Sequence, residues 1–165
     1  MQDGVLLAAV DLGSNSFRLE IGRHEHGQLH RTAYLKETVR QGSGLDEARN
    51  LTPEAMQRGW DCLARFAERL AGFRRPQVRA VATQTLREAR NRDVFLARAQ
   101  QILGFPIDVI SGREEARLIY QGVAHLLPQS LERRLVIDID GLELSPQLRE
   151  LVGKVRSDDP YIAGV

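Results

Sequence analysis

The sequence predicts an α/β fold in which a mixed five-stranded sheet is flanked by helices. Three apolar runs of strand length come first in the chain, and afterwards segments with helical spacing alternate with single short strands. This order is typical of a layered α/β domain whose sheet has both parallel and antiparallel neighbours. With 165 residues, 42% of them hydrophobic and 27% charged, the chain suits about one globular domain.

The first three strands are predicted to pair in sequence as hairpins. Their ranges are Val5 to Val10, Phe17 to Arg23 and Gln28 to Val39. Small residues from Asp11 to Ser16 supply the first turn, and Glu25 to Gly27 supply the second. We expect residues 41–50, which contain Gly42 and Gly44, to form a flexible loop.

Three helices are predicted from their caps and their spacing. Thr52 and Pro53 begin the first, Asn91 caps the second before Gly104 ends it, and Ser111 caps the third. The buried faces of the first two are predicted to be Met56, Trp60, Leu63, Ala67 and Leu70, and Phe95, Ala99, Ile102 and Leu103. The further candidate strands are Val78 to Thr83, Ile107 to Ile110 and Leu135 to Ile139, so the sequence has six segments of strand type for a sheet predicted to have five strands.

Charge and composition exclude several classes of function. Lysine and arginine total 23 against 22 acidic residues, so no overall positive field favours nucleic acid or an acidic membrane surface. The single cysteine, Cys62, excludes an internal disulfide and suits core packing in a reducing compartment. The histidines do not have zinc-ligand spacing, and we find no signal peptide or membrane span, so we expect a cytoplasmic chain.

Three groups of residues could carry phosphate chemistry. Asp11 ends a strand and precedes Gly13, Ser14 and Asn15, which could form a phosphate loop beside a metal ligand or only a hairpin turn. Arg87 follows a buried strand and could hold a phosphate or lie on a surface turn.

Glu114 and Glu115 stand at a helix amino terminus, where Glu114 has capping-box spacing from Ser111. Successive helical side chains diverge by about 100°, so Glu115 must point elsewhere. Glu115 could act as a general base on water, or it could be a solvated charge.

Three segments, in order, resemble the exopolyphosphatase and guanosine pentaphosphate phosphatase family. They are Ala8 to Arg18 (AAVDLGSNSFR), Ala82 to Arg87 (ATQTLR) and Ile110 to Val123 (ISGREEARLIYQGV). The resemblance covers about Leu6 to Ile139. It implies one lobe of a ribonuclease H-like, actin-like fold, in which two such lobes enclose a magnesium-dependent phosphate site.

The resemblance also implies a role for each candidate residue. Gly13, Ser14, Asn15 and Arg87 would bind phosphate, Glu115 would be the catalytic base, and Asp11 and Asp138 would associate with Mg²⁺. The substrate would be inorganic polyphosphate or guanosine pentaphosphate. We predict a lobe at residues 1–140 that binds neither nucleic acid nor a membrane.

The segment after Asp138 departs from the family pattern. Where a glycine triplet would form the second phosphate loop, the chain reads Ile139-Asp140-Gly141-Leu142. We therefore expect no turnover by this chain alone, and self-association is expected if an apolar face stays uncovered.

Residues 141–165 form a divergent tail, predicted to hold a short helix and a turn. The tail resembles part of the amidase N-terminal (AMIN) domain of N-acetylmuramoyl-L-alanine amidases, in which case the chain is a chimera joined inside the strand Leu135 to Ile139. Two alternatives therefore stay open, a non-catalytic phosphate-binding fragment and a peptidoglycan-binding module.

Overall fold

The computed structural model describes residues 3–126 and residue 136. In chain order the elements are β1 (Val5–Leu12), β2 (Ser16–Glu25), β3 (Gln28–Thr38), η1 (Gly42–Gly44), α1 (Pro53–Arg69), η2 (Arg75–Gln77), β4 (Val78–Ala82), α2 (Gln84–Glu88), α3 (Arg92–Leu103), β5 (Ile107–Val109) and α4 (Gly112–Leu126). The predicted strand at Leu135 to Ile139 and the tail lie outside the described residues, except Val136, which belongs to no helix or strand. Within the described ranges, every helix is too short or too polar to cross a bilayer.

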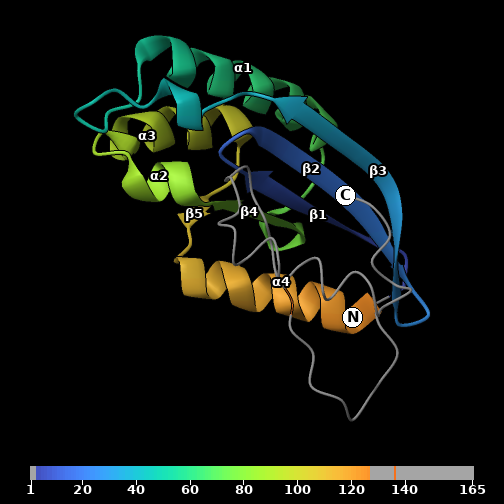
Figure 1. Ribbon diagram of the computed structural model, residues 1–165. Coiled ribbons are helices and arrows are strands. Elements are labelled where there is room, and N and C mark those ends of the chain that lie inside the picture. The colour runs from blue at the N-terminus through green and yellow to red at the C-terminus, as the bar shows by residue number, and fades with distance from the viewer. Residues whose placement is uncertain (1–2, 127–135, 137–165) are drawn as a thin grey trace. The chain divides into compact units, whose positions relative to one another are not determined.

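The strands of the described region form one mixed sheet, as the sequence predicts (Figure 1). Its order is β3-β2-β1-β4-β5, with antiparallel pairing of β1 with β2 and of β2 with β3. β4 pairs in parallel with both β1 and β5. The three mutually parallel strands therefore end at the same edge of the sheet, and the loops that follow them are brought together there.

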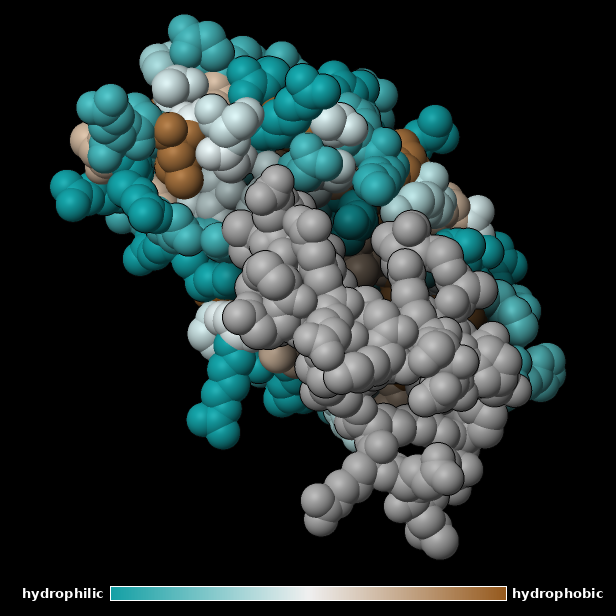
Figure 2. All heavy atoms as spheres, viewed as in Figure 1, coloured by the Kyte–Doolittle hydropathy of each residue, from teal (hydrophilic) through white to brown (hydrophobic). Residues whose placement is uncertain are grey.

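The core lies between the sheet and the pair of helices α1 and α3, which Figure 1 shows on one side of it. Alternate residues of β1 and β2 point into this layer, which explains why Val10, Leu12 and Phe17 are almost completely buried. The helices contribute Phe66 and Phe95, both fully buried. Burial of side chains of this size stabilises the fold by about 1.5–3 kcal/mol each. The surface of the described residues that is visible in Figure 2 is mostly hydrophilic, as expected when the apolar faces of α1 and α3 are turned inward.

The predicted helix caps are confirmed for α1 and corrected for α3. The Thr52 hydroxyl accepts a hydrogen bond from the Ala55 amide at 3.3 Å, and Pro53 is the first residue of α1. Asn91 does precede α3, but its side-chain amide bonds the backbone N–H and C=O of Leu51 instead of the helix. A tertiary contact that uses both the donor and the acceptor of the amide has replaced the local cap.

Two segments differ from the sequence prediction. Residues 41–50, expected to be flexible, contain the short helix η1 and an antiparallel bridge between Leu45 and Leu51. Gln41 in this segment is fully buried. The second difference is α2, which has only five residues and is therefore too short to produce a recognisable helical period.

Candidate active site

Three loops meet at the carboxyl edge of the parallel strands. The Thr83 amide donates to the carbonyl of Leu12 at 3.4 Å, and the Ile110 amide donates to the carbonyl of Ala82 at 3.0 Å. These bonds continue the sheet ladder beyond the strand ends, so the segments after β1, β4 and β5 start as neighbours. Each carries predicted site residues, and this edge is where α/β sheets commonly bind ligands.

The loop after β1 is held by its carbonyl groups. The Ser14 carbonyl accepts from the Gly42 amide at 2.9 Å, and the Asn15 carbonyl accepts from the amides of Val39 and Arg40 at 3.0 and 2.8 Å. A side chain at Gly13 would place its Cβ 2.9 Å from the Ser16 carbonyl oxygen, so only glycine fits without a shift. The segment therefore forms the predicted hairpin turn between β1 and β2, and the same residues are the ones predicted to form a phosphate loop.

The hydroxyl of Ser14 is buried and has no hydrogen-bond partner among the described residues. Leaving a buried polar group without a partner costs about 1–3 kcal/mol. A ligand oxygen that accepted from or donated to this hydroxyl would recover part of that cost. The loop therefore has the chemistry expected of a site for an oxygen-rich anion.

Asp11 lies near the end of β1, directly opposite Arg18 of β2 in the sheet register. The Arg18 guanidinium is 3.6 Å from the Asp11 carboxylate, whose side chain keeps about a third of its surface exposed. Within the described ranges, no three histidine, cysteine or acidic side chains are grouped to hold a metal. Mg²⁺ needs fewer protein ligands, because it commonly binds one or two carboxylates together with water and substrate phosphates. Asp11 fits that requirement, whereas Asp138 lies outside the described residues.

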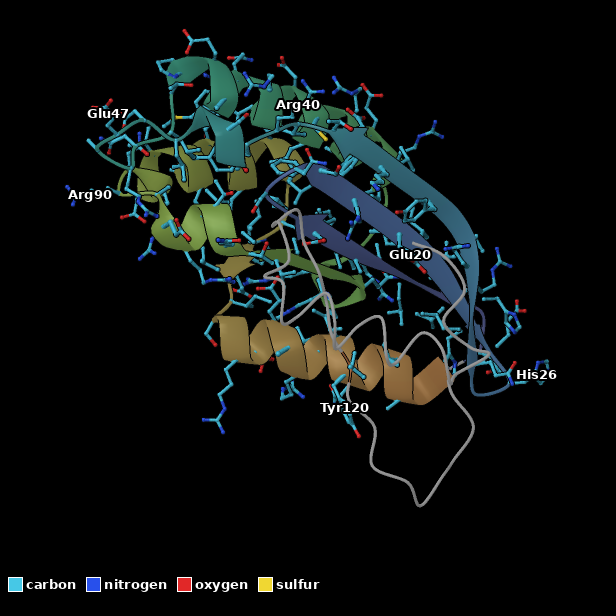
Figure 3. The ribbon with its side chains drawn as sticks, in the orientation of Figure 1. Glu20, His26, Arg40, Glu47, Arg90 and Tyr120 are labelled. Atoms are coloured by element: carbon cyan, nitrogen blue, oxygen red, sulfur yellow. The ribbon has the colours of Figure 1, made fainter. Side chains whose placement is uncertain are left out.

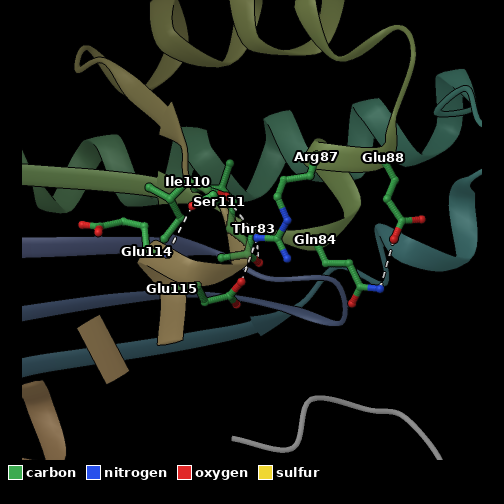
Figure 4. A network of polar contacts seen from close by, with 9 residues as sticks. Thr83, Gln84, Arg87, Glu88, Ile110, Ser111, Glu114 and Glu115 are labelled. Atoms are coloured by element: carbon green, nitrogen blue, oxygen red, sulfur yellow. Dashed lines mark hydrogen bonds and ion pairs between the residues drawn. The ribbon is translucent and has the colours of Figure 1, made fainter. Parts of the chain in front are cut away.

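Arg87 and Glu115 form an ion pair at this edge. One guanidinium nitrogen of Arg87, on α2, donates to the Glu115 carboxylate at 2.7 Å and to the Ile110 carbonyl at 3.1 Å. Both side chains are mostly buried, with 28% and 24% of their surfaces exposed. Figure 4 shows Arg87 reaching from α2 toward Glu115 and Ile110. Arg87 does lie on a helical turn, but its mostly buried side chain points into the site, in contrast to the surface turn that was the other sequence alternative.

The two adjacent glutamates of α4 point in different directions, as predicted. The Glu114 amide donates to the Ser111 hydroxyl at 3.2 Å, which confirms the helix cap. The Glu114 carboxylate is exposed and bonds Arg117, and these hydrogen bonds lower the pKa of Glu114. Glu115 faces Arg87 instead, so the solvated-charge alternative describes Glu114 better than Glu115.

The loop at Gly42 is a part of the site that sequence reasoning missed. A Cβ at Gly42 would lie 3.2 Å from the Thr85 hydroxyl and 3.3 Å from the Ser14 Cβ. Gly42 therefore joins the loop after β1 to the helix that carries Arg87. No local pattern marks this role, because glycine and serine in residues 42–44 are equally typical of an unstructured loop.

Solved structures share this fold. The chain superposes on the Aquifex aeolicus PPX-GPPA enzyme with a TM-score of 0.70 at 29% identity, over 76% of this chain and 42% of that one. It superposes on an exopolyphosphatase from Cytophaga hutchinsonii with a TM-score of 0.68 at 30% identity, over 73% and 39% of the two chains. The five-stranded sheet and its flanking helices are those of a lobe of the ribonuclease H-like, actin-like class. The Ppx/GppA phosphatase family model matches residues 20–158, and the chain belongs to this family.

Curated relatives point to the same family. The guanosine-5'-triphosphate,3'-diphosphate pyrophosphatases of Vibrio campbellii and Vibrio parahaemolyticus are 56% and 57% identical over 136 residues. Each match covers 82% of this chain and 27% of the relative. The chain thus spans about a quarter of the length of these relatives. The AMIN resemblance of the tail is not shown by the comparisons, and the family match continues to residue 158.

Proposed function

We propose that this chain is the N-terminal lobe of a magnesium-dependent phosphoanhydride hydrolase that releases the terminal phosphate of guanosine pentaphosphate or inorganic polyphosphate. One observation carries the proposal: the Arg87–Glu115 pair lies at the same sheet edge as the Gly13–Asn15 loop. A cationic side chain, a carboxylate and a loop with a buried, unpartnered hydroxyl are groups that can position and activate the reactants in phosphoanhydride hydrolysis.

Arg87 and the loop are proposed to hold the terminal phosphate. A guanidinium can bind two phosphate oxygens at once, and Ser14 can supply its hydroxyl to a third. Glu115 is proposed to take a proton from the attacking water. The water oxygen then bonds to phosphorus, the bond from phosphorus to the bridging oxygen breaks, and the shortened chain leaves with that oxygen.

Mg²⁺ is proposed to bind at Asp11, together with Asp138. When bound, the ion would neutralise charge on the phosphate oxygens. Asp11 is suited to this because it lies near the end of β1 at the site edge and is partly exposed. Arg18 and the ion would both interact with the Asp11 carboxylate. The Arg18–Asp11 ion pair is therefore expected to weaken when Mg²⁺ and substrate are present.

Guanosine pentaphosphate is the favoured substrate. The relatives whose names specify that compound are more than 50% identical to this chain, whereas the exopolyphosphatase structure is 30% identical. Both compounds present a terminal phosphoanhydride to the same groups, so the described site serves either.

We further propose that these 165 residues bind phosphate without turning over substrate, in the cytoplasm. The described edge supplies one proposed phosphate loop, and residues 139–142 contain Gly141 but not the glycine triplet of a second one. The resemblance of residues 141–165 to an AMIN domain lies outside the described residues. The predicted self-association depends on whether those residues cover an apolar face. The peptidoglycan-binding alternative has no other support.

The test combines binding and turnover. Titration calorimetry with tripolyphosphate and with guanosine pentaphosphate, each with and without Mg²⁺, should show binding that Arg87→Met weakens by about tenfold. Arg69→Met at the end of α1 is the matched control, since it removes the same charge away from the site. Lack of binding by the folded chain would overturn the proposal. Phosphate release that Glu115→Gln abolishes would instead show that this lobe is sufficient for turnover.

A further inference from the structure

The loop after β1 rests against a second loop, residues 39–42, which we call the bracing loop. Three of its amides, those of Val39, Arg40 and Gly42, donate to the carbonyls of Asn15 and Ser14. The bracing loop therefore fixes the carbonyl side of the proposed phosphate loop.

Fixing the carbonyls also orients the amides of the proposed phosphate loop. In a planar trans peptide the C=O of one residue and the N–H of the next point in opposite directions. The Asn15 N–H shares its peptide plane with the Ser14 carbonyl, which is bound to Gly42, and so it points away from the bracing loop. An amide turned in this way is available to an anion on the other side of the loop.

The bracing loop has an unusual shape that its own contacts do not explain. Arg40 adopts a left-handed φ of +51°, a conformation that costs a non-glycine residue about 1–2 kcal/mol. The next residue, Gln41, is fully buried, and its side-chain amide has no partner among the described residues. The surrounding structure must therefore hold the loop in place.

Arg58 of α1 makes two of the contacts that hold it, alongside the Ser43 hydroxyl, which donates to the Arg40 carbonyl at 2.9 Å. The Arg58 Nε donates to the Val39 carbonyl at 2.9 Å, and its Nη2 donates to the Arg40 carbonyl at 3.3 Å. Figure 3 shows Arg40 where β3 ends beside α1. The Val39 carbonyl that Arg58 binds shares a peptide plane with the Arg40 N–H, which binds Asn15 on the other side. One peptide thus connects the guanidinium to the proposed phosphate loop.

We propose that Arg58 is a positioning residue of the phosphate site. The proposal rests on the proposed function, since it assumes that the loop at Ser14 and Asn15 binds phosphate. Arg58 does not touch the ligand itself. It orients the peptide between Val39 and Arg40, and this peptide in turn orients the loop at Ser14 and Asn15. A charged donor also polarises the peptide, so the Arg40 N–H becomes a stronger donor.

The experiment compares Arg58→Met with Arg58→Lys and with Arg69→Met, a control that removes a charge from the same helix. Amide hydrogen exchange is measured by NMR, and tripolyphosphate affinity by calorimetry. Arg58→Met should raise the exchange rates of the Arg40 and Gly42 amides by about tenfold and weaken tripolyphosphate binding three- to tenfold. Exchange in the middle of α1, at Leu63, should stay unchanged. Arg58→Lys should give a smaller effect, because it keeps the charge but has no fork of donors.

The two readouts separate a positioning role from a general loss of stability. If Arg58→Met raised exchange at Leu63 as much as at Gly42, the effect would be global and the proposal would fail. Equal affinities for Arg58→Met and Arg69→Met would overturn it as well, because charge alone would explain the loss. If the unaltered chain did not bind tripolyphosphate, the proposed function would fall and the phosphate role of Arg58 with it. Binding by the unaltered chain and equally by Arg58→Met would overturn only the role of Arg58.

Discussion

Replacing Glu115 with glutamine is expected to tighten the binding of tripolyphosphate. In the structure, the Arg87 guanidinium is paired with Glu115 at 2.7 Å and also donates to the Ile110 carbonyl. A phosphate that binds Arg87 must compete with that carboxylate. Glutamine keeps the size and the acceptor oxygen of the side chain but removes its charge, so the competition weakens.

The size of the effect follows from the burial of the pair. Exposed ion pairs contribute about 0.2–1 kcal/mol, and hydrogen bonds to charged groups contribute about 1.5–3 kcal/mol. The Arg87 and Glu115 side chains keep 28% and 24% of their surfaces exposed, so the pair lies between these limits. Because glutamine can still accept a hydrogen bond, we expect a gain of about 1 kcal/mol in binding free energy, which is roughly a fivefold lower Kd.

The assay is titration calorimetry with tripolyphosphate in the absence of Mg²⁺, at an ionic strength of about 0.15 M to limit long-range effects. Glu114→Gln is the matched control. It removes the same charge from the neighbouring residue of α4, but Glu114 pairs with Arg117 and not with Arg87. Glu114→Gln should therefore change the Kd by less than about twofold.

Two results would refute this reasoning. An equal gain in both variants would mean that the overall charge of α4 controls anion binding and that the Arg87–Glu115 pair has no special part. An unchanged or weaker affinity in Glu115→Gln would mean that phosphate does not compete for Arg87 at all. In either case the assignment of Arg87 as a phosphate contact would lose its support.

Two further predictions concern stability. Asn91→Ala should lower the free energy of unfolding by about 2 kcal/mol, because it removes two hydrogen bonds and leaves the partly buried N–H and C=O of Leu51 without partners. Urea unfolding measures this loss. A loss below about 0.5 kcal/mol would contradict the prediction. Burial, assisted by the Glu37 carboxylate, raises the pKa of Cys62 from 9.0 to about 12. The thiol therefore ionises first in the unfolded chain, so stability present below pH 9.0 is lost as the pH rises toward 12. Cys62→Ala should reduce the fall in unfolding free energy between about pH 8 and about pH 10 by about 1.3 kcal/mol, and an identical pH slope in both proteins would show the thiol to be uninvolved.

The local structure around the predicted site residues was predicted correctly where it depends on short-range patterns. The strand that leads into the glycine-serine turn, the turn itself and the serine cap of α4 are short-range patterns, and each is present in the structure, although β1 continues to Leu12. The same spacing argument correctly separated Glu114 from Glu115, since adjacent helical side chains diverge. Their proposed roles, in contrast, stay predictions until binding and turnover are measured.

Long-range contacts explain where sequence reasoning failed. Asn91 has the residue type of a helix cap, yet its amide bonds Leu51, forty positions away in the chain. Gly42 and Gly44 have the composition of a flexible loop, yet they pack against Ser14 and Ala55. In each case the preferred local conformation competes with a tertiary contact, and local propensity is too weak to predict the outcome.

The amino-acid sequence by itself determined the order of the strands and of the three long helices, most of the apolar residues that form the core and the residue types of the proposed phosphate site, because hydrophobic period and capping chemistry act over a few residues. The tertiary structure decided that Arg87 pairs with Glu115 and that Arg58 holds the bracing loop. These pairs are 28 and 19 residues apart in the chain. Their contact depends on the parallel pairing of β1, β4 and β5 and on the packing of α1, which no local pattern specifies.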